Sequence, residues 1–306
     1  MTEQTRYDGA AAFLPPRLKM RAEKLLLQDK DSAEEIRLRA GRQPSVLLPD
    51  GEISLGGEAV THQDLSGVLD IATGASAHSA RESVKNGYIT VKGGYRIGLC
   101  GTVLSREREV TGFKTISSVI IRISREVKGA ASDILAKLVL GGEAQSTLII
   151  SPPGGGKTTL LRDIVRSLSD GVGDIGIKGM RISLADERSE IAAMYEGVPQ
   201  LDVGRRTDIL DACPKAFAVM MLLRSANPQM IALDEITAPE DIRAIEMAAN
   251  CGVKLLATAH AHDISDLYGR NLYRQIVETG IFENIVTIKK DGARRRYFTE
   301  EVKVIS

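Results

Sequence analysis

The sequence contains no tryptophan, and its 306 residues include only 5 phenylalanines and 7 tyrosines. Proteins that bind single-stranded nucleic acid stack the bases on aromatic side chains, so this scarcity disfavours a base-stacking surface. Neither charge sign is in excess, because 40 Lys and Arg residues balance 40 Asp and Glu residues. Domains that bind nucleic acid are usually basic. Both absences argue against a nucleic-acid partner, although a local basic patch is compatible with a neutral total.

Cysteine and long apolar runs are also scarce. The three cysteines, Cys100, Cys213 and Cys251, are widely spaced, which predicts reduced thiols in the cytosol. The longest apolar runs, such as residues 216–223, are far shorter than the roughly 20 residues that a helix needs to cross a bilayer. Residues 1–13 are polar and carry both charge signs, unlike a signal peptide. We therefore expect a cytoplasmic protein with no direct membrane span, which reaches a membrane only through a partner.

The first half of the chain is typical of a small α+β domain. Residues 35–39 alternate polar and apolar side chains, which is the period of a half-buried strand. Asp50-Gly51 separates two apolar runs and predicts a β-hairpin. Gly141-Gly142 marks the predicted boundary between this domain and the second half of the chain. Because a chain of this length usually holds two domains, we predict a smaller α+β domain over residues 1–140.

The second half alternates buried strands with helices. Four short runs are mostly apolar, and three longer segments between them have a helical pattern. The runs are residues 147–150, 181–184, 230–233 and 253–257, and the helical segments are residues 157–168, 214–226 and 239–250. Strands of this kind form a parallel sheet covered by helices. The sequence therefore predicts an α/β domain over residues 141–306, closed by a hairpin with Asp291-Gly292 at its turn.

A glycine-rich loop follows the first of these strands and precedes a helix. Glycines let the backbone curl so that several N–H groups face phosphate oxygens, and the helix N-terminus adds a positive dipole. Lys157 would reach the β and γ phosphates of ATP, and the Thr158 hydroxyl would hold Mg²⁺. The predicted ATP-binding residues are Ser151, Pro152, Pro153, Gly154, Gly155, Gly156, Lys157, Thr158 and Thr159. Ser151 stands where this P-loop pattern usually begins with glycine, and the three later glycines supply the turn.

Acidic residues end two of the other predicted strands. Asp234 and Glu235 end one, and Asp234 would bind Mg²⁺ while Glu235 orients the attacking water. Glu187, after Asp186, ends another. Because the carboxyl ends of parallel strands meet at one crevice, Glu187 and Glu235 compete for the role of general base. His260 follows a third strand and would lie near the γ-phosphate as a sensor.

Hydrolysis also needs a cation to meet the charge that develops on the γ-phosphate, and an arginine of a neighbouring subunit often supplies it. The sequence offers several candidates and does not choose among them. They are Arg96 in the first domain, Arg205 and Arg206 in a connection rich in Gly and Asp, and Arg224.

At this point the chain resembles the stage III sporulation protein AA family. The resemblance rests on six strings along most of the chain: residues 35–42, 94–101, 150–163, 185–190, 202–208 and 211–215. That family is similar to the secretion ATPases of type II and type IV systems, which are hexameric motors with a RecA-like C-terminal domain. The resemblance thus implies a RecA-like P-loop NTPase domain, with a PAS-like N-terminal domain before it.

The resemblance also implies roles for particular residues. Lys157 and Thr158 match the Walker A residues, Asp234-Glu235 match Walker B, and His260 matches the His box. Glu187 belongs to the Asp box, whose Glu the family favours as general base. Arg96 falls in the region that supplies arginine fingers.

The implied role is to energise a channel between mother cell and forespore during endospore formation. The chain would form a homo-hexamer on the cytoplasmic face in the mother cell, held by membrane proteins of the channel complex. Two alternatives stay open at this stage. One is a hexameric motor that acts on nucleic acid, and the other is a structural ring that ATP merely holds together.

Overall fold

The computed structural model describes residues 5–74, 87–106, 109–123, 126–291 and 294–302. The chain divides into two compact units. Unit 1 comprises Met1–Arg125 together with Ala193–Gln200, and unit 2 comprises Glu126–Ala192 and Leu201–Ser306. The division into domains at residues 140 and 141, and the PAS-like character of the first, stay predictions.

Unit 1 is built on an antiparallel sheet of six strands in the order β3-β2-β1-β6-β5-β4. The predicted strand and hairpin are confirmed, because β1 is Glu35–Arg39 and the Asp50-Gly51 turn joins β2 to β3. Residues 36 and 38 of β1 are buried while their neighbours are half-buried, as the alternating sequence requires. The remaining strands are β2 (Ser45–Leu48), β3 (Gly51–Ser54), β4 (Tyr88–Val91), β5 (Tyr95–Arg106) and β6 (Glu109–Arg122).

The described residues of unit 1 form the helices α1 (Arg6–Ala11), α2 (Pro16–Ala22), α3 (Leu27–Ser32) and α4 (His62–Thr73). Helices α1 and α4 each begin with a Thr and Asp capping box, which satisfies N–H groups that a helix start leaves free. The helix expected around residues 64–85 ends at Thr73, and residues 75–86 lie outside the described residues. A short hairpin, β13 (Met194–Tyr195) with β14 (Val198–Pro199), also belongs to this unit.

Unit 2 is built on a largely parallel sheet of seven strands in the order β15-β12-β16-β17-β9-β18-β19. Every neighbouring pair is parallel except β18 and β19, which form the predicted closing hairpin. The strands are β9 (Thr147–Ile150), β12 (Ile182–Asp186), β15 (Thr207–Asp211), β16 (Met230–Leu233), β17 (Lys254–Ala259), β18 (Asn284–Asp291) and β19 (Arg294–Glu301). The predicted parallel sheet is thus confirmed, and β15 is a further strand at its edge.

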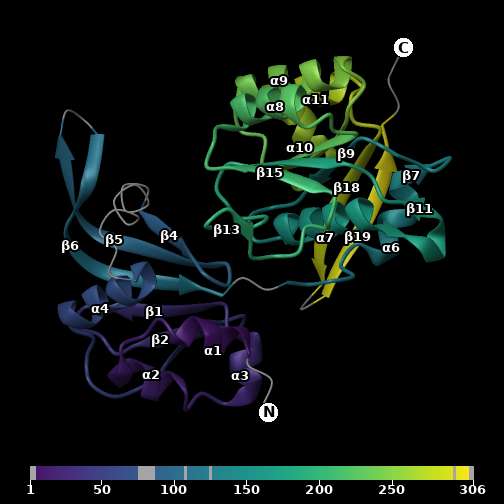
Figure 1. Ribbon diagram of the computed structural model, residues 1–306. Helices are drawn as coiled ribbons and strands as arrows, with labels where there is room; N and C mark the ends of the chain where they lie inside the picture. The colour runs from purple at the N-terminus through teal and green to yellow at the C-terminus, as the bar shows by residue number, and fades with distance from the viewer. Residues whose placement is uncertain (1–4, 75–86, 107–108, 124–125, 292–293, 303–306) are drawn as a thin grey trace. The chain divides into compact units, whose positions relative to one another are not determined.

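Helices cover both faces of this sheet (Figure 1). Helix α7 (Lys157–Asp170) lies on one face, and α8 (Lys215–Ser225), α9 (Pro239–Asn250), α10 (Ile264–Gly269) and α11 (Asn271–Glu278) lie on the other. Short elements complete the unit: α6 (Ser132–Leu135), η1 (Ala136–Leu138), β7 (Val139–Leu140), β8 (Glu143–Ala144), β10 (Gly171–Val172), η2 (Gly173–Ile175) and β11 (Ile177–Lys178). In the described part of the chain, no helix is both long and apolar enough to cross a membrane.

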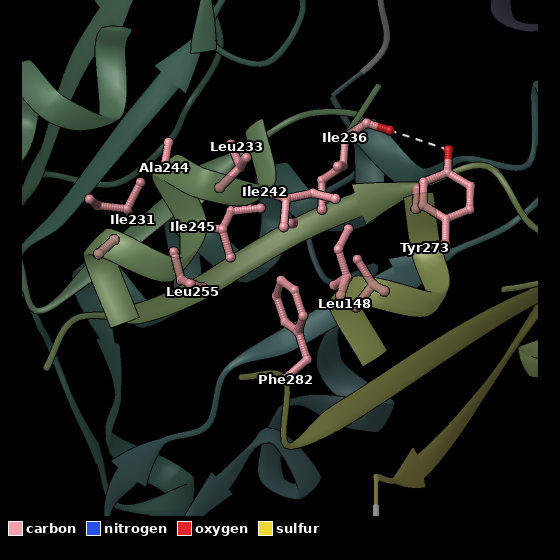
Figure 2. Close-up of a cluster of buried hydrophobic side chains, with 14 of the residues drawn as sticks. Leu148, Ile231, Leu233, Ile236, Ile242, Ala244, Ile245, Leu255, Tyr273 and Phe282 are labelled. Carbon is pink, nitrogen blue, oxygen red and sulfur yellow. Dashed lines mark hydrogen bonds between the residues drawn. The ribbon is translucent and has the colours of Figure 1, made fainter. Parts of the chain in front are cut away.

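The main core of unit 2 fills the space between the sheet and helices α8 to α11. Figure 2 shows Leu255 of the sheet beside Ile245 of α9, with Leu148 and Phe282 in the same buried cluster. One polar group enters this core, because the Tyr273 hydroxyl donates to the Ile236 carbonyl over 3.2 Å. The core fixes β16, β17 and β9 side by side, so it also fixes where their carboxyl ends lie.

Shortening a core side chain of α9 should therefore destabilise unit 2. Ile245 is fully buried, whereas Met247 on the same helix is 49% exposed. We expect Ile245→Ala to lower the free energy of unfolding by about 2–5 kcal/mol, and Met247→Ala to change it by about 0.5 kcal/mol or less. Urea denaturation followed by circular dichroism measures both variants. Equal effects of the two substitutions would contradict the position of the core.

Candidate nucleotide-binding site

The glycine-rich loop leaves the carboxyl end of the buried strand β9 and leads directly into α7. Gly154 and Gly156 have φ angles of 68° and 101°, in the left-handed region that costs a residue with a side chain about 1 kcal/mol or more. Gly156 is the N-cap of α7, and no side chain caps the helix there. The first N–H groups of α7 therefore face the loop without a side-chain acceptor.

The contacts of Ser151 explain why the loop can begin with a serine in place of glycine. Its side chain is buried, and its hydroxyl donates to the Pro152 carbonyl over 2.9 Å. This bond leaves no room for a side chain at Gly155, whose Cβ would lie 2.2 Å from the Ser151 Oγ. The loop is thus drawn tight by one internal hydroxyl and by glycines at positions where a Cβ would clash or strain.

Lys157 extends from the first turn of α7 back toward the carboxyl ends of the strands. Its ammonium donates to the Ser151 carbonyl over 3.2 Å and lies 2.7 Å from His260 Nδ1. Burial lowers the pKa of Lys157, while the charges of Glu235 and Asp234 act in the opposite direction. The ammonium is therefore held by polar partners in a place that is costly for a charge.

His260 connects Lys157 to Glu235. Its Nε2 lies 2.8 Å from Glu235 Oε1, while Nδ1 faces the Lys157 ammonium. Because an ammonium can only donate, Nδ1 of the His260 ring accepts. Nε2 therefore carries the N–H group that donates a hydrogen bond to Glu235. Glu235 Oε2 also lies 3.7 Å from Arg188 Nη1.

Asp234 lies beside this chain of contacts at the end of β16. Its Oδ1 accepts from the Thr258 hydroxyl over 2.8 Å and from the Glu235 N–H over 3.0 Å. Thr258 belongs to β17, so the neighbouring parallel strand orients the carboxylate. Glu235 itself has a φ of 32°, which shows that the backbone turns sharply where the two acids leave the strand. Thr158 and Thr159 lie half-buried beside Lys157 on the first turn of α7.

The acids at the end of β12 have different surroundings. Asp186 is buried and accepts hydrogen bonds from the backbone N–H groups of residues 190–192. Burial, together with the charge of Asp234, raises the pKa of Asp186 to about 6, even though those hydrogen bonds act to lower it. Glu187 is paired with the buried Lys215 at the start of α8 over 2.8 Å. Burial alone would raise the pKa of Glu187, but the Lys215 hydrogen bond and charge outweigh it, so the net shift is downward.

The arginines expected to act on phosphate are not gathered at the loop within one chain. The Arg205 guanidinium is paired with the Asp170 carboxylate over 3.5 Å, and the Arg206 guanidinium donates to the Ser169 carbonyl over 2.9 Å. Both therefore hold the C-terminal end of α7, which is about 20 Å along the helix from its first residue. Arg96 belongs to unit 1, where its guanidinium lies 3.6 Å above the Tyr88 ring. Arg224 is exposed in the last turn of α8.

Three functional contacts were not predicted from the sequence. Lys215 binds Glu187 and Arg188 approaches Glu235, as described above. Arg295 of β19 donates from Nε to the Gly155 carbonyl over 3.0 Å. Arg188 directly follows Asp186-Glu187, so proximity along the chain could have suggested it. Arg295 is 140 residues from Gly155, and no local pattern signals that contact.

Two solved structures have the same fold. The ATPase DotB of Yersinia pseudotuberculosis matches 100% of this chain and 82% of its own at 15% identity, with a TM-score of 0.64. The pilus retraction motor PilT, solved with bound ADP, matches 89% of this chain and 80% of its own at 15% identity, with a TM-score of 0.54. The chain thus shares its fold with an ATPase and with a pilus retraction motor.

Sequence comparisons identify the family to which the chain belongs. Residues 16–298 match the family described as "Sporulation stage III, protein AA". The chain is 36% identical over 299 residues to Stage III sporulation protein AA of Bacillus subtilis strain 168, covering 97% of this chain and 96% of that protein. The chain therefore belongs to the stage III sporulation protein AA family, and the resemblance seen in the sequence is confirmed.

Asp186 should make stability depend on pH. Its folded pKa of about 6 lies above its ordinary value of 3.8, so the folded protein binds the proton more tightly than the unfolded chain. Stability then falls as pH rises from about 4 to 6. In the wild type, this proton should make the free energy of unfolding fall by about 2–3 kcal/mol across the window, since each pKa unit is worth about 1.4 kcal/mol. We expect Asp186→Asn to remove this part of the pH dependence. Urea denaturation at several pH values measures it, and an unchanged slope would contradict a raised pKa.

Proposed function

We propose that this chain is a Mg²⁺-dependent ATPase and that residues 151–159 bind the phosphates of ATP. The observation that carries the proposal is the meeting of the glycine loop, Lys157, His260 and Glu235 at the carboxyl ends of β9, β17 and β16. A turn that only joined a strand to a helix would not need a buried lysine with two acids nearby. A site for ATP with Mg²⁺ gives each of these groups a role, since the loop and Lys157 would hold phosphate while the acids would serve the metal ion and the attacking water.

The loop supplies phosphate contacts through its backbone. Left-handed glycines turn N–H groups toward one side, and the uncapped start of α7 adds its dipole. The Lys157 ammonium is held by Ser151 and His260. A phosphate oxygen is a stronger, charged acceptor for an ammonium than a carbonyl or an imidazole. Lys157 would therefore exchange those partners for the β and γ phosphates.

Thr158 and Asp234 fit a magnesium ion, because hydroxyl and carboxylate oxygens are the ligands that it prefers. The Thr258 hydroxyl leaves the second Asp234 oxygen available for a metal. When bound, Mg²⁺ would neutralise charge on the phosphate oxygens.

Two glutamates are candidates for the general base. We propose Glu187 as the base, as the family resemblance implies, with Glu235 orienting water. The Lys215 pair keeps Glu187 ionised, which a base requires, but it also occupies one carboxylate oxygen. Glu235 is joined to Lys157 through His260, so its position responds when Lys157 changes partners. His260 would in this way sense the γ-phosphate.

The proposed role is a motor that energises assembly of, or transport through, the channel between mother cell and forespore. Membership in a stage III sporulation family and the secretion-ATPase fold support it. The chain would act in the mother-cell cytoplasm as a homo-hexamer, bound to membrane proteins of the channel complex. Arg96, Arg205 or Arg206 would then reach a neighbouring subunit's site. A nucleic-acid motor or a purely structural ring is the alternative, and stimulation of hydrolysis by DNA or RNA would favour the former.

Two substitutions separate nucleotide binding from turnover. Lys157→Ala should abolish ATP binding and hydrolysis. Glu187→Gln should lower kcat by about 10²–10⁴-fold, the usual contribution of a general base, with little change in ATP affinity. Glu278→Gln, exposed on α11, is the control. A larger kcat loss in Glu235→Gln than in Glu187→Gln would reverse the two roles. Normal sporulation with Glu187→Gln would contradict the motor hypothesis and favour the structural ring.

A site shared between subunits makes the ATPase rate per subunit rise with protein concentration. Arg96→Ala should then lower kcat by about 10³-fold or more, as loss of an arginine finger does. Its matched control is Arg122→Ala, the residue opposite Arg96 on the neighbouring strand β6. A rate that is flat with concentration and indifferent to Arg96 would mean that each chain holds a self-contained site.

A further inference from the structure

The basic hairpin at the end of the chain places an arginine against the candidate phosphate loop. Strand β18 pairs with β9 in parallel, and β19 pairs with β18, with Arg295 opposite Lys290. From this strand Arg295 donates through Nε to the Gly155 carbonyl over 3.0 Å. The contact joins the second-to-last residue of the loop to a strand that is not adjacent to it in sequence or in the sheet.

The guanidinium lies close against the loop. A Cβ at Gly156 would be 2.6 Å from Arg295 Nε and 3.1 Å from its Cδ. Two features therefore favour glycine at this position. Its φ is 101°, and Arg295 lies where a side chain would be. Such a close approach orients the planar group before any ligand arrives.

Only part of the guanidinium is used in this contact. Arginine has five N–H donors in a fixed fork, and among the described residues the hydrogen bond of Arg295 is the one from Nε to Gly155. The side chain is exposed, so the Nη groups are accessible at the edge of the loop. A fork of this shape matches the oxygens of a phosphate group.

We propose that Arg295 is a nucleotide-binding residue of its own chain. The Nε bond to Gly155 orients the side chain, and the Nη groups bind phosphate oxygens of a nucleoside di- or triphosphate held by the loop. This assignment rests on the proposed ATP site. It adds a cation supplied in cis, distinct from any arginine that a neighbouring subunit contributes. Inorganic pyrophosphate has the same chemistry and can serve as a minimal probe.

Calorimetric titration of the full-length protein with pyrophosphate, ADP and ATP tests the proposal. Arg295→Gln keeps an amide that can donate to Gly155 but removes the charge. Its affinity for all three probes should fall about tenfold to a hundredfold, the range for a charged hydrogen bond. Arg294→Gln is the matched control, because the neighbouring residue points to the opposite face of the strand and is exposed. It should bind each probe within about twofold of the wild type.

Arg295→Lys separates a phosphate contact from a brace that acts only through Nε. Lysine retains the charge, so a phosphate contact predicts an affinity between those of the wild type and Arg295→Gln. A pure brace predicts that Lys and Gln are equally impaired, and that result would overturn the proposal. Wild-type affinity for pyrophosphate in Arg295→Gln, or a loss confined to ATP, would overturn it as well. Failure of the wild type to bind any probe would instead refute the proposed ATP site.

Discussion

The Lys157 ammonium is the group around which the candidate site is arranged. It is largely removed from water, and burial lowers its pKa, so it requires polar partners to remain charged. Ser151 supplies one from the loop, and His260 supplies the other from the end of β17. Each partner is fixed by a strand of the same parallel sheet. The position of the ammonium therefore depends on strand order, and strand order depends on the apolar core beneath it (Figure 2).

A second arrangement ties the loop helix to the end of β12. Arg162 of α7 donates to the carbonyls of Ile191 and Glu190, over 2.5 and 2.8 Å. Asp186 accepts from the N–H groups of residues 190–192 on the other side of the same backbone. The segment is thus held through both its donors and its acceptors, which a buried irregular backbone needs. It lies between the catalytic candidate Glu187 and residues 193–200, which belong to unit 1.

The elements that could be predicted from the sequence are those with a regular apolar pattern, such as β1, β16 and α9. Strand β16 and helix α9 have the predicted bounds, because an apolar run and a helix beginning with Pro239 mark their ends. Strand β15 was not predicted, since Thr207–Asp211 is polar and only half-buried at the sheet edge. Strands β5 and β6 extend well beyond the predicted runs, into stretches that are mostly exposed and in which even the apolar residues Val103, Leu104 and Val110 are not buried. The convergence of Lys157, Asp234 and His260 followed from parallel topology alone, but the Lys215 and Arg295 contacts depend on side-chain reach between distant segments.

The arginines at the two ends of α7 have opposite relations to its dipole. At the C-terminus, Arg205 and Arg206 meet the partial negative charge of the last carbonyls. At the N-terminus no side chain caps the helix and no acidic residue lies in the first turn, so the partial positive charge there is not offset. An anion bound at the loop would meet that charge. Arg295 donates through Nε to the Gly155 carbonyl, and its side chain is exposed. Within one chain, Arg205 and Arg206 contact the far end of the helix, whereas Arg295 of the closing hairpin contacts the loop.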